Sequence, residues 1–337
     1  MLKELGLSDL KELMKSTIPE KVMDPQPFTH ANGEILEAVP EKLLLDKITK
    51  IAQKNKLHKC YIGGGYYDTI MPEVIKRNLL ENPNWYTAYT PYQAEISQGR
   101  VETLLNYQTL MVELTGLENS NSSLLDEGTA CAEAMTMSFI TTNQKKDTFF
   151  VSSNVFPQSI EVLKTRAGNN SINLVIGDPN TFDFSSIAER LGGILFQTPD
   201  VHGVLNNYSD IIQKLKSQVK DLTVVVACDP LALLKTITPG EMGADIAVGS
   251  AQRFGVPMGF GGPHAAFLVA KASAIRKIPG RIIGVSKDAH GNKAFRLTLQ
   301  TREQHIKREK ATSNICTAQV LLANISALYA VYHGKQV

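Results

Sequence analysis

Cysteine is scarce in this chain of 337 residues, and no cysteine has a close cysteine neighbour. Cys60, Cys131, Cys228 and Cys316 form no CxxC pair and no zinc-ligand spacing, so we expect free thiols that pack in the core of a protein from a reducing compartment. The sequence also lacks an apolar run of the roughly 18 residues that a membrane-spanning helix needs. A disulfide scaffold, a metal-binding cysteine module and a membrane-spanning protein are therefore not expected.

A large charge of one sign is also missing. The net charge of +2 is too small and too dispersed to indicate a nucleic-acid-binding protein. The longest basic-rich stretch, Arg302 to Lys310, is interrupted by two glutamates and is interpreted as a solvated helix face. The segment from Met1 to Glu20 carries four acidic residues, too many for a targeting peptide, and its start is interpreted as internal to a longer precursor.

The composition, 43% hydrophobic and 20% charged residues, is that of a globular protein with one large domain and an appended segment. No solenoid repeat and no low-complexity segment is present. Leucines from Leu2 to Leu13 predict a short helical hairpin, and prolines then mark a connector before a helix over 41–55. A further helix is predicted over 72–80. We interpret residues 1–83 as a helical arm and residues 84–337 as the large domain.

Beyond residue 84, helical and strand patterns alternate. An amphipathic helix is predicted from Val101 to Gly116, and another over 318–333. Short runs of Val, Ile and Leu separated by helices predict a mostly parallel sheet that is covered on both faces, so the fold class is α/β. The predicted strands are 148–151, 173–176, 193–196, 223–227, 246–248 and 265–268, and the helices between them are 159–167, 185–190 and 210–219.

Three short motifs could carry chemistry. In the first, Asp126 to Ala130, Gly-Thr at a helix start offers amides and a hydroxyl to a phosphate, although an ordinary helix cap with small residues for close packing is favoured on this motif alone. In the second, a buried strand delivers Asp229 at its carboxyl end, where an aspartate can pair with a pyridinium nitrogen or simply form a turn before proline. The third, Gly255 to His264, is a glycine-rich loop or a tight connection between two strands.

Longer segments over essentially the whole chain carry a family resemblance. Residues 84–100 read NWYTAYTPYQAEISQGR, residues 123–130 read SLLDEGTA, and residues 308–319 read REKATSNICTAQ. These segments closely resemble the glycine decarboxylase family, the P-proteins of the glycine cleavage system, and more narrowly their N-terminal half, which is a separate α subunit in some bacteria. The resemblance implies the pyridoxal-phosphate-dependent transferase fold of type I, similar to aspartate aminotransferase.

In that family, the cofactor lysine lies in a His-Lys-Thr-type motif of the C-terminal half. The matching segment here, Ser250 to Phe254, places Gln252 or Arg253 at the lysine position, and neither side chain can form the Schiff base. The resemblance therefore implies a degenerate half whose partner, the catalytic half or β subunit, binds pyridoxal phosphate covalently. Since the chain stops at Val337, the small C-terminal domain is expected to be missing from a partial sequence.

The resemblance also implies roles for particular residues. Tyr92 and Glu95 are expected to support catalysis, while Thr90, Gln93, Ser97 and Gln98 form a substrate or interface wall; packing between the two halves is the alternative role of this segment. Glu127, Gly128, Thr129 and Asp229 are expected to be relics of a cofactor site, and no metal ligands are assigned.

The implied reaction is the decarboxylation of glycine with transfer of the aminomethyl group to the lipoyl arm of the H-protein, catalysed by a dimeric assembly of halves. Such a protein acts in the mitochondrial matrix of a eukaryote or in the bacterial cytoplasm. The isolated chain is predicted to be inactive. Two alternatives remain open: a non-catalytic scaffold or regulatory subunit, and an independent pyridoxal enzyme that uses Lys235 or Lys271.

Overall fold

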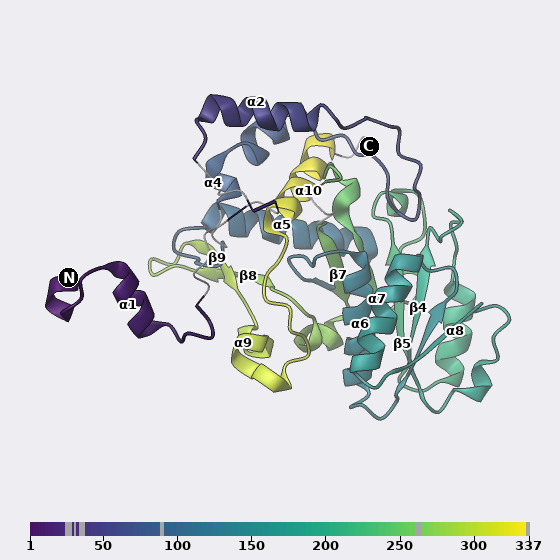
Figure 1. The fold of residues 1–337 in the computed structure, drawn as a ribbon. Coiled ribbons are helices and arrows are strands. Elements are labelled where there is room, and N and C mark those ends of the chain that lie inside the picture. The colour runs from purple at the N-terminus through teal and green to yellow at the C-terminus, as the bar shows by residue number, and fades with distance from the viewer. Residues whose placement is uncertain (24–28, 30–31, 34–37, 88–90, 260–263, 335–337) are drawn as a thin grey trace. The chain divides into compact units, whose positions relative to one another are not determined.

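The computed structural model describes residues 1–23, 29, 32–33, 38–87, 91–259 and 264–334 (Figure 1). The chain packs as two compact units, Met1–Lys59 and Cys60–Val337. The first unit contains the short 3-10 helix η1 (Leu2–Leu5) and the helices α1 (Leu10–Thr17) and α2 (Glu41–Ala52). Asp9 begins α1 because its carboxylate accepts the backbone N–H of Glu12 at 2.8 Å. The helices predicted in this region are confirmed.

A seven-stranded mixed sheet forms the centre of the second unit. Its strand order is β1-β7-β6-β5-β4-β2-β3, in which β3, β2, β4, β5 and β6 run parallel while β7 and β1 are antiparallel to their neighbours. The predicted class, α/β with a mostly parallel sheet, is confirmed. The strands are β1 (Asn119–Ser120), β2 (Thr148–Ser152), β3 (Asn173–Gly177), β4 (Leu191–Thr198), β5 (Thr223–Cys228), β6 (Ile246–Ser250) and β7 (Ala266–Ala270).

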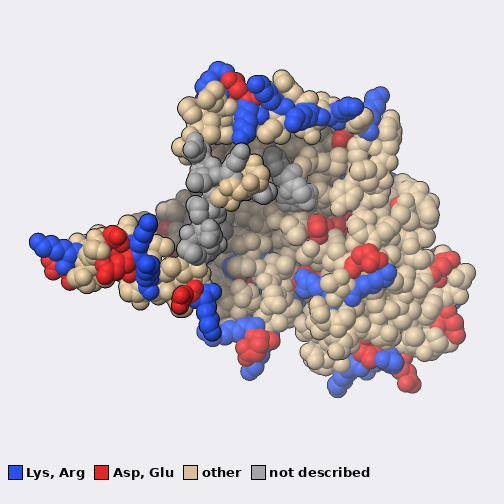
Figure 2. Space-filling model, in the orientation of Figure 1, with Lys and Arg blue, Asp and Glu red and all other residues tan. Residues whose placement is uncertain are grey.

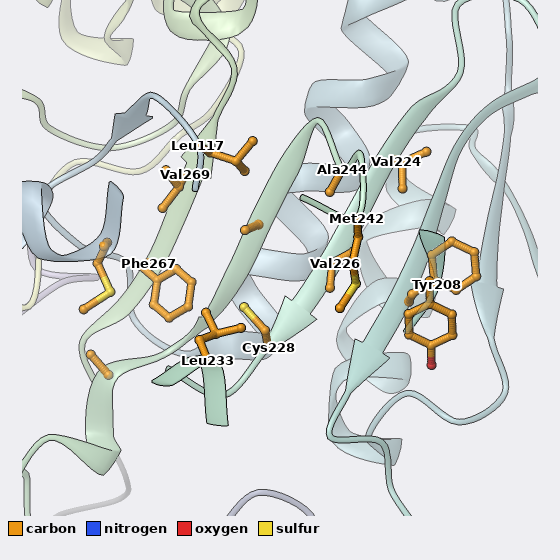
Figure 3. Packing of buried hydrophobic residues seen from close by; sticks show 14 of the residues in the cluster. Leu117, Tyr208, Val224, Val226, Cys228, Leu233, Met242, Ala244, Phe267 and Val269 are labelled. Carbon is orange, nitrogen blue, oxygen red and sulfur yellow. The ribbon is translucent and has the colours of Figure 1, made fainter. Parts of the chain in front are cut away.

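Helices cover both faces of this sheet. Helices α5 (Gln98–Thr115), α8 (Ser209–Gln218) and α10 (Val320–His333) pack on one face, and α6 (Glu127–Thr141) and α7 (Pro157–Asn169) pack on the other. Alternate residues along each central strand therefore enter different halves of the core, as Val226 and Val225 of β5 do. Figure 3 shows Val226 and Cys228 of β5 in the first half, with Phe267 of β7 nearby. Fully burying each valine or phenylalanine side chain contributes about 1.5–3 kcal/mol, so these contacts stabilise the sheet that positions the site.

A two-stranded hairpin lies outside the main sheet and was not predicted. Strands β8 (Ile283–Lys287) and β9 (Lys293–Leu297) pair antiparallel. Two glutamines of α5 hold the hairpin: Gln108 accepts the N–H of Ile283 at 2.8 Å and donates to its carbonyl oxygen, and Gln98 makes the same pair of bonds with Phe295. The hairpin is thus fixed to α5 by side-chain-to-backbone hydrogen bonds.

Three local predictions are wrong. Only Cys131 and Cys228 pack in the core, because Cys316 is exposed and Cys60 is only partly buried. Residues 185–190 form no helix beyond one 3-10 turn, because the Asp183 carboxylate accepts the N–H and hydroxyl of Ser185 and so competes with helical hydrogen bonds. Arg302 is not on a solvated helix face. Its guanidinium is buried and donates to the carbonyl oxygens of Ile278 and Gly280, which a solvent-facing side chain could not reach.

The remaining elements are short and connect the larger ones. They are α3 (Glu73–Ile75), the π-helical turn η2 (Lys76–Leu80), α4 (Pro83–Tyr86), η3 (Phe184–Ser186), η4 (Ala232–Leu234), η5 (Ala251–Arg253), η6 (Ala272–Lys277), η7 (Gln300–Arg302), α9 (Gln304–Lys307) and η8 (Arg308–Lys310). Helix α5 ends at Gly116, whose φ of 67° is the left-handed conformation that glycine adopts at low cost.

Candidate functional site

Polar residues gather at the carboxyl ends of the parallel strands, where ligands of open α/β sheets bind. Asp229 follows β5, and Gln252 and Arg253 lie in the turn η5 directly after β6. Glu127 opens helix α6 and lines the same cavity as Arg253. The structure therefore brings three of the predicted relic residues, Glu127, Gly128 and Asp229, together near Arg253. The fourth, Thr129, contributes only its backbone N–H to the cap at Asp126.

Arg253 takes the centre of this cluster. Its Nε donates to Asp229 Oδ2 at 3.1 Å, its Nη2 donates to the carbonyl oxygen of Gly65 at 2.8 Å, and only 4% of the residue is exposed. The hydroxyl of Tyr67 donates to the same Asp229 oxygen at 2.6 Å, and the guanidinium lies over the Tyr67 ring. Burial and the neighbouring Asp229 raise the pKa of Tyr67, so it stays a donor. The Asp229 carboxylate is thus already paired within the chain.

Glu127 is buried at the first position of α6. Burial raises its pKa to about 7, although Arg253 and the Gln197 side chain favour its charged form. Its Oε1 atom has no hydrogen-bond partner among the described residues. A carboxyl group with this pKa changes charge near neutral pH, at the helix end where a phosphate would otherwise bind.

The start of α6 is a capped helix packed closely on α7. The Asp126 carboxylate accepts the N–H of Thr129 at 2.7 Å. A Cβ atom on Gly128 would lie 3.2 Å from Val162 Cγ2 of α7, closer than most such contacts, so glycine permits the close approach of the two helices. The interpretation of this motif as a helix cap with small residues for packing accounts for this geometry.

Pyridoxal phosphate, which the family resemblance implies, does not fit this cluster. Gln252 is fully buried and donates to the carbonyl oxygen of Val256 at 2.7 Å, and Arg253 occupies Asp229. The cavity beside them has a volume of about 80 Å³, whereas pockets for drug-sized ligands and cofactors have about 300–1,000 Å³.

Neither alternative lysine lies at a suitable place. Lys271 follows β7 at the amino end of neighbouring β6, the opposite edge of the sheet, and its Nζ pairs with Asp245 at 2.7 Å. Lys235 is an exposed residue that ends the turn η4. The structure thus offers no support for an independent pyridoxal site at Lys235 or Lys271.

Tyr92, which was predicted to support catalysis, contacts a backbone N–H group and an arginine side chain. Its hydroxyl accepts the N–H of Ala318 at 2.8 Å, and the Arg281 guanidinium lies 4.9 Å from its ring centroid. Burial raises its pKa, so the hydroxyl stays protonated at neutral pH. Arg281 in turn donates to the carbonyl oxygen of Cys316 and pairs with Glu303. Tyr92 therefore helps to hold the segment that leads into α10.

The other predicted site residues of the 90–98 segment differ in their exposure to solvent. Ser97 is buried and accepts from Arg100, and Gln98 holds the hairpin through Phe295. Gln93 and Glu95 are exposed. Thr90 lies outside the described residues. The structure thus places Ser97 and Gln98 in packing contacts and leaves Gln93 and Glu95 accessible.

A wide groove runs beside these accessible residues. It has a volume of about 900 Å³ and lies between the 92–98 segment and the β8–β9 hairpin. Its charged lining combines Glu95 and Asp288 with Lys287, Lys293 and Arg296. The groove is large enough for a substrate or a partner's side chains, unlike the cavity beside Arg253.

Three contributors to these sites were not singled out from the sequence. Gly65 and Tyr67 complete the Arg253 cluster, and Arg281 packs on Tyr92. Three consecutive glycines, Gly63 to Gly65, precede two tyrosines, and this pattern could have indicated a tight loop. In the structure all three glycines adopt positive φ. Nothing in the local pattern around Arg281 marks it.

Acidic and basic side chains are interspersed on the face shown in Figure 2. In the part of the chain that the structure describes, no helix has the length and apolarity to cross a membrane. Over the same residues, no group of three or more His, Cys, Asp and Glu side chains is arranged to hold a metal ion.

Comparison with known proteins gives consistent matches. The family model for the glycine cleavage system P-protein matches residues 1–337. A glycine dehydrogenase (decarboxylating) from Nostoc sp. is 54% identical over 336 residues, which are 100% of this chain and 33% of that protein. The protein of the same name from Pelagibacter ubique is 51% identical over 337 residues, covering 100% of this chain and 34% of that protein. The chain spans about a third of the length of these curated relatives.

Solved structures agree with the fold. The crystal structure of glycine decarboxylase (P-protein) of the glycine cleavage system, in inhibitor-bound form, superimposes with a TM-score of 0.88 at 34% identity, covering 100% of this chain and 75% of that chain. A probable N-succinyldiaminopimelate aminotransferase from Thermus thermophilus gives a TM-score of 0.51 at 13% identity, over 88% of this chain and 74% of that chain. The second likeness concerns the fold alone.

Proposed function

The chain belongs to the glycine cleavage system P-protein family, and from this premise we propose that it is the N-terminal, lysine-less half of a glycine decarboxylase. The complete assembly decarboxylates glycine and passes the aminomethyl group to the lipoyl arm of the H-protein. In this proposal the catalytic half binds pyridoxal phosphate, and this chain pairs with it in a dimeric assembly of halves. Because the similar proteins named above are bacterial, we place the assembly in the cytoplasm.

The observation that carries this proposal is the pairing of Asp229 with Arg253. A fold of this kind offers its strand-end aspartate to a cofactor ring, but here a buried guanidinium holds the carboxylate at 3.1 Å. Removing that guanidinium to admit a cofactor would leave charges buried without a partner. The chain therefore supports the site of another half instead of forming its own.

We further propose a functional division into an arm of residues 1–83 and a degenerate large domain of residues 84–337. This division differs from the division by packing, because Gly65 and Tyr67 contact Arg253 and Asp229. In the large domain, Tyr92 and Glu95 support the partner's active site, with Thr90, Gln93, Ser97 and Gln98 as the surrounding wall. The exposure of Glu95 beside a groove of about 900 Å³ favours this role most directly.

The first test asks whether this chain forms a covalent cofactor adduct. The chain is incubated with pyridoxal phosphate, and the visible spectrum is recorded before and after reduction with borohydride. We expect no stoichiometric adduct on any single lysine, because Gln252 and Arg253 stand where the amine is needed. A reducible adduct at one specific lysine, such as Lys235 or Lys271, would overturn the assignment.

The second test measures glycine decarboxylation by the complex of this chain with the catalytic half. Glu95→Gln removes a charge from an exposed side chain, so assembly should be unaffected. If Glu95 contacts the reacting centre, the rate falls by roughly a hundredfold, the usual cost of losing one catalytic hydrogen bond. Glu113→Gln, at another exposed carboxylate, is the matched control.

A non-catalytic scaffold is the second candidate function, favoured by the use of Tyr92 and Gln98 in packing. It predicts that Glu95→Gln and Tyr92→Phe both assemble normally and decarboxylate glycine at the unmodified rate. Such a result would make the 90–98 segment an interface and the chain a structural partner.

A further inference from the structure

The cavity beside Arg253 contains buried polar groups that the proposed function does not use. It has a volume of about 80 Å³ and is bounded by the first turn of α6, the start of α7, the loop at Gly64–Tyr66, Arg253 and His264. One water molecule needs roughly 10–15 Å³ of such space, so there is room for a ligand of a few non-hydrogen atoms.

Three side chains that line this cavity have a polar atom without a hydrogen-bond partner among the described residues. The atoms are Glu127 Oε1, Ser159 Oγ and His264 Nε2. The three residues are only 8%, 1% and 4% exposed, respectively. Because a buried polar atom without a partner is costly, so many at one place indicate that something else binds there.

His264 has one tautomer in which it can donate into the cavity. The N–H of Gln252 donates to Ser250 Oγ at 3.2 Å, so the Ser250 hydroxyl proton is free to donate to His264 Nδ1, which lies 3.2 Å away. In the tautomer in which Nδ1 accepts from Ser250, the ring proton lies on Nε2 and faces the site proposed below. Burial and Arg253 lower the pKa of His264, which keeps the ring neutral. His264 Nε2 and the Ser159 hydroxyl can therefore both donate to a ligand's oxygen atoms.

The charges around the cavity oppose a simple ion of either sign. Asp126 and Glu127 repel an anion, while the positive N-terminal end of α6 repels a cation. Arg253 and Asp229 largely cancel each other as an ion pair. A small ligand with both a positive and a negative end matches this arrangement.

We propose that this cavity binds a short zwitterionic α-amino acid, with its ammonium group at Glu127 and its carboxylate at Ser159, His264 and the first turn of α6. The site is separate from the groove at Glu95 and would act as an effector site in the lysine-less half. Short side chains are required because the cavity is small and Gly128 packs directly on α7.

Calorimetric titration of the full chain tests this proposal without any decarboxylation assay, so its failure and that of the proposed function are distinguishable. The probes are glycine, acetate, which has only the carboxylate, and methylammonium, which has only the cation. We expect glycine to saturate one site per chain, and acetate and methylammonium each to bind at least tenfold more weakly. Dissociation constants in the millimolar range are measurable with ligand at about 10 mM.

Two variants connect the binding to the cavity. Glu127→Gln keeps the shape of the side chain but removes the charge, and should weaken glycine binding by roughly tenfold to a hundredfold, the loss of one charge-assisted hydrogen bond. Ser159→Ala removes a hydroxyl donor from a buried position and should weaken it less. Glu241→Gln, at an exposed carboxylate elsewhere, should leave the affinity unchanged.

Two results of the titrations would contradict the proposed amino-acid site. No saturable heat with glycine would mean that the cavity holds only water. Equal binding of acetate and glycine, or tighter binding of acetate by Glu127→Gln, would make it an anion site. Either result overturns the proposal, and a thermal melt of each variant shows whether it is folded.

Discussion

The cluster at Arg253 and the groove at Glu95 use similar residues in opposite ways. At the first, Arg253 and Asp229 pair with each other, the buried Glu127 carboxyl group feels the charge of Arg253, and about 80 Å³ of space is left. At the second, Glu95 is exposed along a groove of about 900 Å³. A buried ion pair is costly to open, whereas an exposed side chain can contact a partner with little rearrangement. The position of a residue in a family motif therefore does not by itself decide its role.

The largest expected effect comes from opening the buried cluster. Arg253→Met leaves the carboxylates of Asp229 and Glu127 without their cation, and should lower the free energy of unfolding by about 3–5 kcal/mol. Urea denaturation measures this change. Arg190→Met breaks an exposed ion pair with Asp147 and should cost at most about 1 kcal/mol. Equal effects of the two variants would break the contrast between buried and exposed charges.

The pH dependence of stability gives the next largest effect. The pKa of Glu127 is about 7 in the folded chain against an ordinary value of 4.5, so the folded state binds this proton more tightly. The contribution of Glu127 to stability therefore falls by about 3 kcal/mol as the pH rises from 4.5 through 7. Subtracting the profile of Glu127→Gln from that of the unmodified chain isolates this term. A difference that does not vary with pH would show that Glu127 is not desolvated.

Loss of the Gln108 side chain, which holds the β8–β9 hairpin on α5, should have an intermediate effect on stability. Gln108→Leu leaves the buried N–H and carbonyl oxygen of Ile283 without partners, at a cost of about 2 kcal/mol. Hydrogen exchange at the Ile283 amide should become faster. Gln93→Leu, on the exposed side of the same groove, serves as the control and should change neither quantity. A protected Ile283 amide in Gln108→Leu would mean that the hairpin is held by other contacts.

The smallest effect on stability is expected at Tyr92. Tyr92→Phe loses the hydrogen bond from the Ala318 N–H but keeps the ring under Arg281, so the free energy of unfolding should fall by only about 1 kcal/mol. Tyr86→Phe, at an exposed ring, provides the comparison in thermal melts. If Tyr92→Phe lowers the rate of decarboxylation much more than it lowers stability, Tyr92 supports catalysis as Glu95 is proposed to do.

The sheet could be predicted from the sequence because its strands are continuous apolar runs. Segments such as 223–227, which became β5 (Thr223–Cys228), need only local periodicity to be recognised. The hairpin β8–β9 was missed because Lys287, Lys293 and Arg296 mask its alternation, although Gly291 with positive φ marks its turn. Local hydrogen bonding by Asp183 likewise stopped a helix that the pattern favoured.

The candidate site was predictable only in part. Asp229 could be placed at a ligand-binding edge because it follows an apolar strand. That its partners are Arg253, Tyr67 and Gly65 could not be read from the chain, since Tyr67 and Asp229 are 162 positions apart. Contacts over such separations depend on the tertiary fold and leave no local periodicity. The same holds for Arg281, which reaches Tyr92 from a distant segment.

The contacts of Arg253 with Asp229 and Gly65 also decide whether an amine could take its place. Its planar fork binds Asp229 and the Gly65 carbonyl at once, and a Cβ on Gly65 would lie 2.9 Å from Nη2. An ammonium group has no such fork and cannot replace both contacts in the same geometry. Arg253→Lys would therefore lose the hydrogen bond to the Gly65 carbonyl oxygen or the ion pair with Asp229. An imine-forming amine at this position would therefore need coordinated changes in several segments of the chain.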